Sequence, residues 1–252
     1  MNAELVIESL DRRPELAPML WKLSDVWPPF MTRDPVSDFY YETVERDHPE
    51  HTLIAFDPAK PDVPVARAFT VPFEFGTAER SSLPDGGWDT VIRWAALDRS
   101  MGRPRTHVSA LEIAISLDRR GEGLAAVMLQ AMRENVRRLG FTELVAPVRP
   151  SGKSQEAQTP MSEYAFRTRD DGLPEDPWLR VHVRAGGELV RVCPRSMVVG
   201  GSLAEWREWT GLPFDRTGDV VVPGALVPAH CSVEHDHAVY VEPNVWVRHR
   251  LG

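Results

Sequence analysis

The sequence has little of several features that would place a protein in a special class. It holds only two cysteines, Cys193 and Cys231, which stand far apart, so reduced thiols are expected rather than a disulfide. No stretch approaches the roughly 20 apolar residues that a membrane-spanning helix needs. The first residues also contain no apolar run of signal-peptide length. Together these absences predict a cytoplasmic protein without a membrane segment.

Positive charge is also in deficit. The chain has 29 Lys and Arg against 37 Asp and Glu, which gives a net charge of −8 at pH 7. This balance argues against an extended nucleic-acid surface, although a local arginine cluster can still hold a small anion. The 252 residues, of which 42% are hydrophobic, are enough to bury one large core or two small ones.

Apolar patterning predicts that strands and helices alternate along the chain. Strands are expected at residues 4–8, 51–57, 65–75, 109–117, 141–148 and 188–199. Helices are expected at residues 16–27, 35–47, 124–139 and 177–185, and Ser202 with Glu205 predicts a capping box that opens one more. The segment 76–105 is rich in turn formers and is expected to be irregular.

The turn RGEGLA, residues 120–125, joins the strand at 109–117 to the helix at 124–139. Glycines at this place leave several backbone N–H groups without intrahelical partners, and the helix dipole adds partial positive charge. Such a turn suits a phosphate group. It also lies at the carboxyl end of its strand, where ligands bind in open α/β sheets.

The order of elements and the sequence RGEGLA together resemble the GNAT (GCN5-related N-acetyltransferase) superfamily. Its signature is Gln/Arg-x-x-Gly-x-Gly/Ala, and Arg120, Gly123 and Ala125 fill the specified positions. The resemblance covers about residues 3–195. The insertion at 76–105 and a C-terminal extension at about 196–252 depart from it. It implies a single domain over residues 1–252, with an α/β fold and a mixed, twisted central sheet flanked by helices.

The resemblance also implies a co-substrate, acetyl-CoA or another acyl-CoA. The pyrophosphate would be held by the turn, and the pantetheine arm would pair with the end of the preceding strand. Glycine lets the backbone approach phosphates closely, and neighbouring arginines add charge-assisted contacts. The residues implied in binding are Ile113, Ala114, Ile115, Arg119, Arg120, Gly121, Glu122, Gly123, Leu124 and Ala125.

Acyl transfer to an amine needs a base, a stabilised oxyanion and an acid that protonates the leaving thiolate. Glu112 is the candidate base, because it lies opposite the apolar face of its strand and close to the phosphate turn; a salt-bridge or solvated carboxylate is the alternative. The family typically places a tyrosine acid four residues before the glycine that is Gly186 here. His182 occupies that position as a candidate imidazolium acid, with a packing role as its alternative. Tyr164 is the reserve acid.

No metal is expected, because the residues His230, Cys231, His235 and His237 match no strong ligand spacing. The sequence thus predicts an acyl-CoA-dependent N-acyltransferase, acting by direct attack on a small-molecule amine. A homodimer is left open. The alternatives are a carrier-protein or aminoacyl-tRNA donor, a non-catalytic acyl-CoA sensor, and a nucleotide-binding module.

Overall fold

The computed structural model describes residues 5–23 and 26–252. Within that part of the chain, one nine-stranded sheet has the order β1-β2-β3-β4-β5-β9-β8-β7, and β6 also pairs with β9. All neighbouring pairs are antiparallel except β4 and β5, so the expected mixed sheet is confirmed. The strands are β1 Val6–Ser9, β2 Thr52–Phe56, β3 Pro64–Phe73, β4 His107–Ile115, β5 Glu143–Val148, β6 Gly187–Ser202, β7 Gly218–Val220, β8 Ala229–Ser232 and β9 His237–Arg250.

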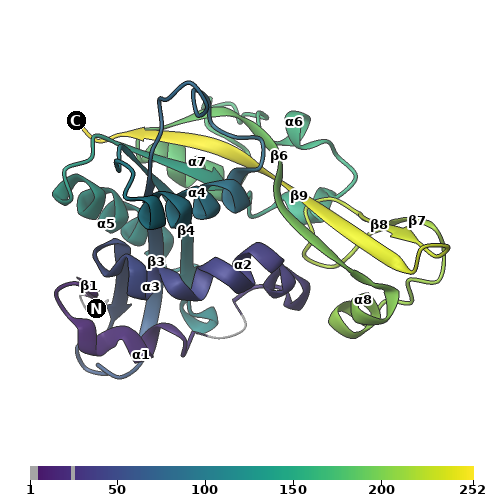
Figure 1. Cartoon of the computed structure of the whole chain (residues 1–252), viewed down its shortest axis with the longest axis horizontal. Helices are drawn as coiled ribbons and strands as arrows, with labels where there is room; N and C mark the ends of the chain where they lie inside the picture. The colour runs from purple at the N-terminus through teal and green to yellow at the C-terminus, as the bar shows by residue number, and fades with distance from the viewer. Residues whose placement is uncertain (1–4, 24–25) are drawn as a thin grey trace.

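Helices flank the sheet, and Figure 1 shows β6 and β9 leaving the body of the molecule together as an arm that carries α8, β7 and β8. The described helices are not long and apolar enough to cross a membrane. The α-helices are α1 Ala17–Leu20, α2 Pro35–Tyr40, α3 Val44–Asp47, α4 Gly87–Met101, α5 Leu124–Arg138, α6 Met161–Tyr164, α7 Pro177–Arg184 and α8 Leu203–Thr210. The 3₁₀ turns are η1 Pro14–Leu16, η2 Pro29–Arg33, η3 Tyr41–Thr43, η4 Pro49–His51, η5 Leu117–Arg119 and η6 Lys153–Glu156.

The helix caps follow from the sequence. Ser202 and Glu205 form the predicted capping box of α8, and the Asp176 side chain accepts from two backbone N–H groups at the start of α7. The helix expected over 16–27 is shorter, because α1 ends at Leu20 and Trp21 instead stacks on Phe69. Residues 24 and 25 of that prediction lie outside the described residues.

The segment expected to be irregular contains a long helix, α4. Its buried residues Trp88, Val91, Ile92 and Ala95 recur at helical spacing and pack in the core cluster that includes Phe73. The turn formers of residues 76–86 hide this periodicity in the sequence. The insertion is therefore a packed layer on the sheet, and it contacts β3, β4 and β6.

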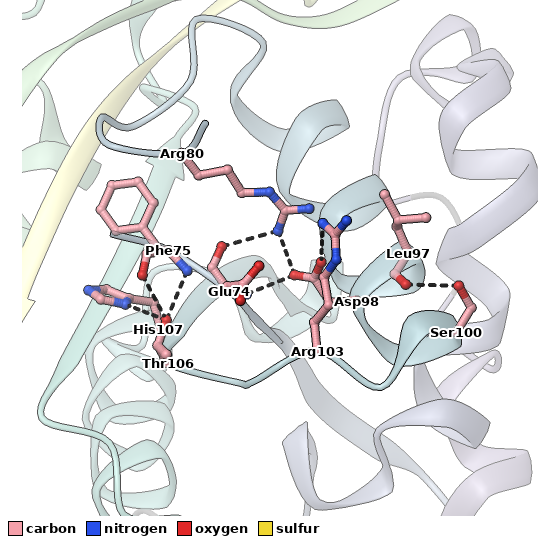
Figure 2. A network of polar contacts seen from close by, with 9 residues as sticks. All are labelled: Glu74, Phe75, Arg80, Leu97, Asp98, Ser100, Arg103, Thr106 and His107. Carbon is pink, nitrogen blue, oxygen red and sulfur yellow. Dashed lines mark hydrogen bonds and ion pairs between the residues drawn. The ribbon is translucent and has the colours of Figure 1, made fainter. Parts of the chain in front are cut away.

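A network of polar contacts fastens the end of α4 to the end of β3 (Figure 2). The buried Asp98 carboxylate accepts from the Glu74 backbone N–H at 2.7 Å and from Arg80 Nη1 at 2.6 Å. Arg103 Nη1 lies 3.6 Å from the other oxygen of Asp98. Thr106 adds two further hydrogen bonds: its Oγ1 accepts from the Phe75 backbone N–H and donates to the Phe75 carbonyl.

The C-terminal strand is part of the central sheet. In β9, residues 245–250 pair with all of β5 on one edge, and β6 pairs with β9 on the other edge from His249 out to His237. The expected core boundary near residue 195 therefore falls inside β6, and only the middle of the extension leaves the body. Since β5 has β4 on one edge only, β9 supplies the partner that its other edge needs.

Candidate active site

A cavity of about 1060 Å³ runs from the RGEGLA turn to the base of the arm. One end is lined by β4, the turn, α5, β5 and α7, and the other by α2, η2 and residues of β6, β9 and the β7–β8 connection. The cavity thus joins the predicted cofactor region to a separate pocket.

The cofactor end opens where two parallel strands separate. Strands β4 and β5 pair only through Val108 with Leu144 and Ser109 with Val145. Beyond these pairs the strands diverge, and residues 110–115 and 146–148 line the cavity on either side. In the described sheet no strand pairs with that edge of β4, which includes Ile113, Ala114 and Ile115, so its backbone is open to an extended amide-bearing ligand.

The turn before α5 presents free backbone donors. Gly121 and Gly123 have φ angles of +85° and +79°, a left-handed conformation that favours glycine, and a Cβ at either position would meet no atom within 4 Å. The first hydrogen bond after the turn runs from the Ala126 N–H to the Gly123 carbonyl at 3.1 Å. Among the described residues, none accepts from the N–H groups of residues 121–125. The turn therefore has the free donors expected of an anion site.

Two arginines border this turn, and both line the cavity. Arg119 is paired with Glu122 at 2.9 Å, and Arg120 Nη2 donates to the Val26 carbonyl at 3.1 Å. The Val26 carbonyl is uncharged, so this hydrogen bond does not neutralise the positive charge of Arg120, which borders the turn.

Glu112 lies in the cavity wall, but its carboxylate is occupied. Arg67 Nε donates to Oε2 at 2.8 Å, and Arg67 Nη2 donates to Oε1 at 3.4 Å. Trp27 Nε1 donates to Oε1, and the Tyr41 hydroxyl donates to Oε2. Both side chains of the Arg67–Glu112 pair are buried. Glu112 is thus a salt-bridge partner that also lines the cavity, and its role as the base stays a prediction.

Aromatic rings hold this network in place. Tyr41 packs edge-on against Phe69 at 5.3 Å and lies 5.8 Å from Trp88 between ring centroids. Arg67 Cζ lies 5.0 Å from the Trp21 ring. Sequence reasoning missed Tyr41, Arg67 and Trp27 as site residues. A signal for Arg67 exists, because a charge within the apolar strand 65–73 needs a partner when it is buried.

His182 also lines the cavity, yet its surroundings do not fit an imidazolium acid. The side chain is only 2% exposed, and its Nδ1 lies 2.9 Å from His249 Nε2. Burial first, and the neighbouring His249 second, lower the pKa of His182 to about 3. The ring is therefore neutral near pH 7, and the expectation that it donates a proton as a cation is corrected.

Tyr164, the reserve acid, does not line the cavity as far as the described residues define it. Its hydroxyl donates to Asp176 Oδ2 at 3.0 Å, and that oxygen also accepts from the Gly152 backbone N–H at 2.8 Å. Burial and Asp176 raise the pKa of the phenol. Tyr164 thus anchors the start of α7, because a tertiary hydrogen bond holds it away from the site.

The far end of the cavity is acidic, and the arm supplies part of it. The exposed carboxylates of Asp38 and Glu42 line it, and so does the buried Glu242. Arg149 Nε donates to Glu242 Oε2 at 2.9 Å. The arm residues lining the cavity are Met197, Gly224, Glu242 and Asn244.

The histidines near the tip of the arm have local partners. His230 Nδ1 lies 3.1 Å from Asp219 Oδ1, and His235 Nδ1 lies 2.8 Å from Ser232 Oγ. Over residues 5–23 and 26–252, no group of three or more His, Cys, Asp or Glu side chains is arranged to hold a metal ion.

Comparison with known proteins places this geometry in a family. The chain is 30% identical over 275 residues to the arginine N-acetyltransferase avaD of Aspergillus versicolor, covering 97% of this chain and 93% of that protein. The loading GNATL domain of CurA from Lyngbya majuscula has a TM-score of 0.60 at 15% identity, with 98% of this chain and 97% of that chain covered. The GNAT-like decarboxylase of GphF, in complex with isobutyryl-CoA, has a TM-score of 0.54 at 12% identity, with 99% and 100% covered.

The two structural likenesses confirm the fold, and no protein-family model matches the sequence. The sequence relationship extends over nearly all of both chains, which confirms the resemblance found in RGEGLA and its flanking elements. The chain belongs to the GNAT superfamily and is an acyl-CoA-dependent N-acyltransferase of small-molecule amines.

Proposed function

We propose that the protein transfers the acetyl group of acetyl-CoA to an amino group of arginine or of a small molecule that contains arginine. The observation that carries this proposal is a single cavity that joins free backbone amides at one end to an acidic, aromatic pocket at the other. The arginine N-acetyltransferase named above supports both the acetyl group and the acceptor.

The cofactor end fits coenzyme A in two respects. The amides of residues 121–125, with Arg119 and Arg120, would bind the pyrophosphate. The open edge of β4 at Ile113, Ala114 and Ile115 would pair with the amides of the pantetheine arm. An extended ligand bound to both would lie along the wall that contains Glu112.

The acceptor end fits a cation. Asp38, Glu42, Glu112 and Glu242 line the cavity, and so do the arginines Arg67 and Arg149. Each arginine is already paired with one of these carboxylates, which leaves Asp38 and Glu42 to attract a guanidinium or ammonium group. The rings of Trp21 and Trp88 also line the cavity, so the pocket is aromatic as well as acidic.

Direct attack on the thioester agrees with the positions of the two cysteines. Both Cys193 and Cys231 are buried, and neither lines the cavity in the described part of the chain. Burial raises the pKa of the Cys193 thiol to about 12, so it is not a thiolate near neutral pH. A covalent acetyl-enzyme on cysteine is therefore disfavoured.

The test is an acetylation assay with the purified protein. Acetyl-CoA is supplied with L-arginine, and in parallel with lysine, agmatine or tryptamine, while thiol release and product mass are measured. We expect acetylarginine to form with the highest kcat/KM of the panel. Release of thiol with another amine, but none with arginine, would overturn the proposed acceptor.

A further inference from the structure

The reaction must move one proton from the attacking nitrogen to the departing sulfur, and the groups named so far do not do this alone. His182 is neutral, and Tyr164 is held outside the cavity. Both oxygens of Glu112 already accept hydrogen bonds from side chains. A proton can reach Glu112 only if one of its donors delivers it or moves aside.

Among the described residues, three side chains donate to Glu112, and they differ in whether they can exchange a proton with it. The indole N–H of Trp27 has no lone pair with which to take a proton back, and the guanidinium of Arg67 stays protonated. Only the Tyr41 hydroxyl can both give a proton and accept one. Tyr41 also lines the cavity in which the acceptor would bind.

The surroundings of Tyr41 favour a transient transfer rather than a standing phenolate. Burial and the negative charge of Glu112 raise the pKa of the phenol well above its usual value, so Tyr41 rests protonated. Arg67 acts in the opposite direction, because its nearby positive charge lowers the pKa of the phenol.

We propose that Tyr41 is a catalytic proton relay between the acceptor and Glu112, an inference that rests on the proposed function. The neutral amine attacks the thioester carbon and forms the C–N bond, and the attached nitrogen gives its proton to Tyr41 Oη. In the same step the phenol proton passes to Glu112 Oε2. When the C–S bond breaks, this proton returns through Tyr41 to the thiolate of coenzyme A. One proton has then moved from nitrogen to sulfur, and both side chains are restored.

The test is the variant Tyr41→Phe, which keeps the aromatic ring but removes the oxygen. Glu112 keeps its bonds from Arg67 and Trp27, so we expect a native fold, with urea unfolding as the check. We expect kcat to fall about 100-fold, since positioned proton transfer contributes on that order, and the KM for acetyl-CoA to stay within about twofold. The matched control is Tyr40→Phe, the same change at a neighbouring residue that does not line the cavity. It should leave kcat unchanged.

A solvent deuterium isotope effect separates transfer from mere positioning. The kcat of wild type should differ between H₂O and D₂O. The size of this isotope effect should change in Tyr41→Phe, because the proton then follows another route. A folded Tyr41→Phe with kcat within about threefold of wild type and the same isotope effect would overturn the relay.

Hydrolysis of acetyl-CoA without an amine separates this inference from the proposed acceptor. Water then attacks the thioester and must lose a proton by the same route, so Tyr41→Phe should slow hydrolysis as well. A wild type that hydrolyses acetyl-CoA but does not acetylate arginine contradicts the acceptor alone. Equal hydrolysis rates for wild type and Tyr41→Phe would overturn the relay whatever the acceptor is.

Discussion

Two buried carboxyl groups, those of Asp34 and Asp89, lie near each other. Asp34 is fully buried and Asp89 is 6% exposed, and the Oδ1 of each has no hydrogen-bond partner among the described residues. Burial raises the pKa of Asp34 to about 6. Burial, and then the nearby charge of Asp34, raise the pKa of Asp89 to about 8. Asp89 is therefore largely neutral at pH 7.

Replacing Asp89 by Asn should stabilise the protein at high pH. The folded state keeps a proton on Asp89 up to about pH 8, whereas an unfolded aspartate loses it near pH 4. The folded state thus binds more protons in this window, and the wild-type free energy of unfolding falls by up to about 1.4 kcal/mol per pH unit as pH rises. Asn does not titrate. The variant's free energy of unfolding, relative to wild type, should therefore rise from pH 5 to pH 8.

Urea unfolding at pH 5, 6.5 and 8 measures this difference. The control is Asp170→Asn, the same change at an exposed residue, whose difference from wild type should stay level across the series. Parallel curves for Asp89→Asn and wild type would contradict the raised pKa.

For single residues, the sequence predicts Glu112 as a site residue but does not predict the side chains that bond to it. Glu112 stands out because its strand alternates and its carboxylate faces away from the apolar side. Tyr41 and Arg67 are 71 and 45 residues away in the chain, and they reach Glu112 only through the packing of η3 and β3. The register of β3 against β4, which shifts at Phe69, sets where Arg67 lies relative to Glu112. No local pattern in the sequence predicts this shift.

Among the elements, α4 depends on one buried ion pair at its end. Asp98→Asn should destabilise the protein by about 3 kcal/mol, because Arg80 is then left buried without its counter-charge. The measurement is urea unfolding followed by circular dichroism. Arg103→Ala is the control: it removes the half-exposed, more distant partner of Asp98 and should change stability by less than about 1 kcal/mol. Equal losses in the two variants would contradict the role of burial.

The turn before α5 can be tested with glycines that share one conformation. Gly123→Ala places a Cβ at a φ of +79°, which costs about 1–2 kcal/mol and distorts the free amides, so the KM for acetyl-CoA should rise about tenfold or more. Gly140→Ala has the same type of backbone strain, at φ +90° and likewise in open space. Because Gly140 lies at the far end of α5, its variant should lose similar stability and keep its KM. A rise in KM for both would show that strain alone is responsible.

Elements with strong periodicity were predictable, and those that depend on partners were not. Strand β4, helix α5 and strand β5 follow local patterns of apolar residues, and the structure confirms them. Helix α4 follows such a pattern too, but the turn formers before it obscured its start. The helix after residue 16 ends early because the contact of Trp21 with Phe69 outweighs local propensity.

For the whole molecule, the course of the C-terminal residues could not be read from the sequence. Strand β9 returns from the tip of the arm to pair with β5, about 100 residues earlier in the chain, as in Val145 with Arg248. Several segments have a strand pattern, so periodicity alone does not choose a partner. This return is what brings Glu242 and Asn244 to the cavity, and the acceptor wall therefore depends on the longest-range pairing in the fold.

The overall charge of −8 and the acidic acceptor end predict how salt affects the reaction. Salt screens exposed charges beyond roughly 10 Å, so kcat/KM for arginine should fall roughly 3- to 10-fold between 50 and 500 mM NaCl at saturating acetyl-CoA. Citrulline has nearly the same shape but an uncharged side chain, so its kcat/KM should change less. The double variant Asp38→Asn, Glu42→Gln removes the two exposed carboxylates and should reduce the salt dependence for arginine. Equal salt dependence for arginine and citrulline would show that these charges do not guide the acceptor into the cavity.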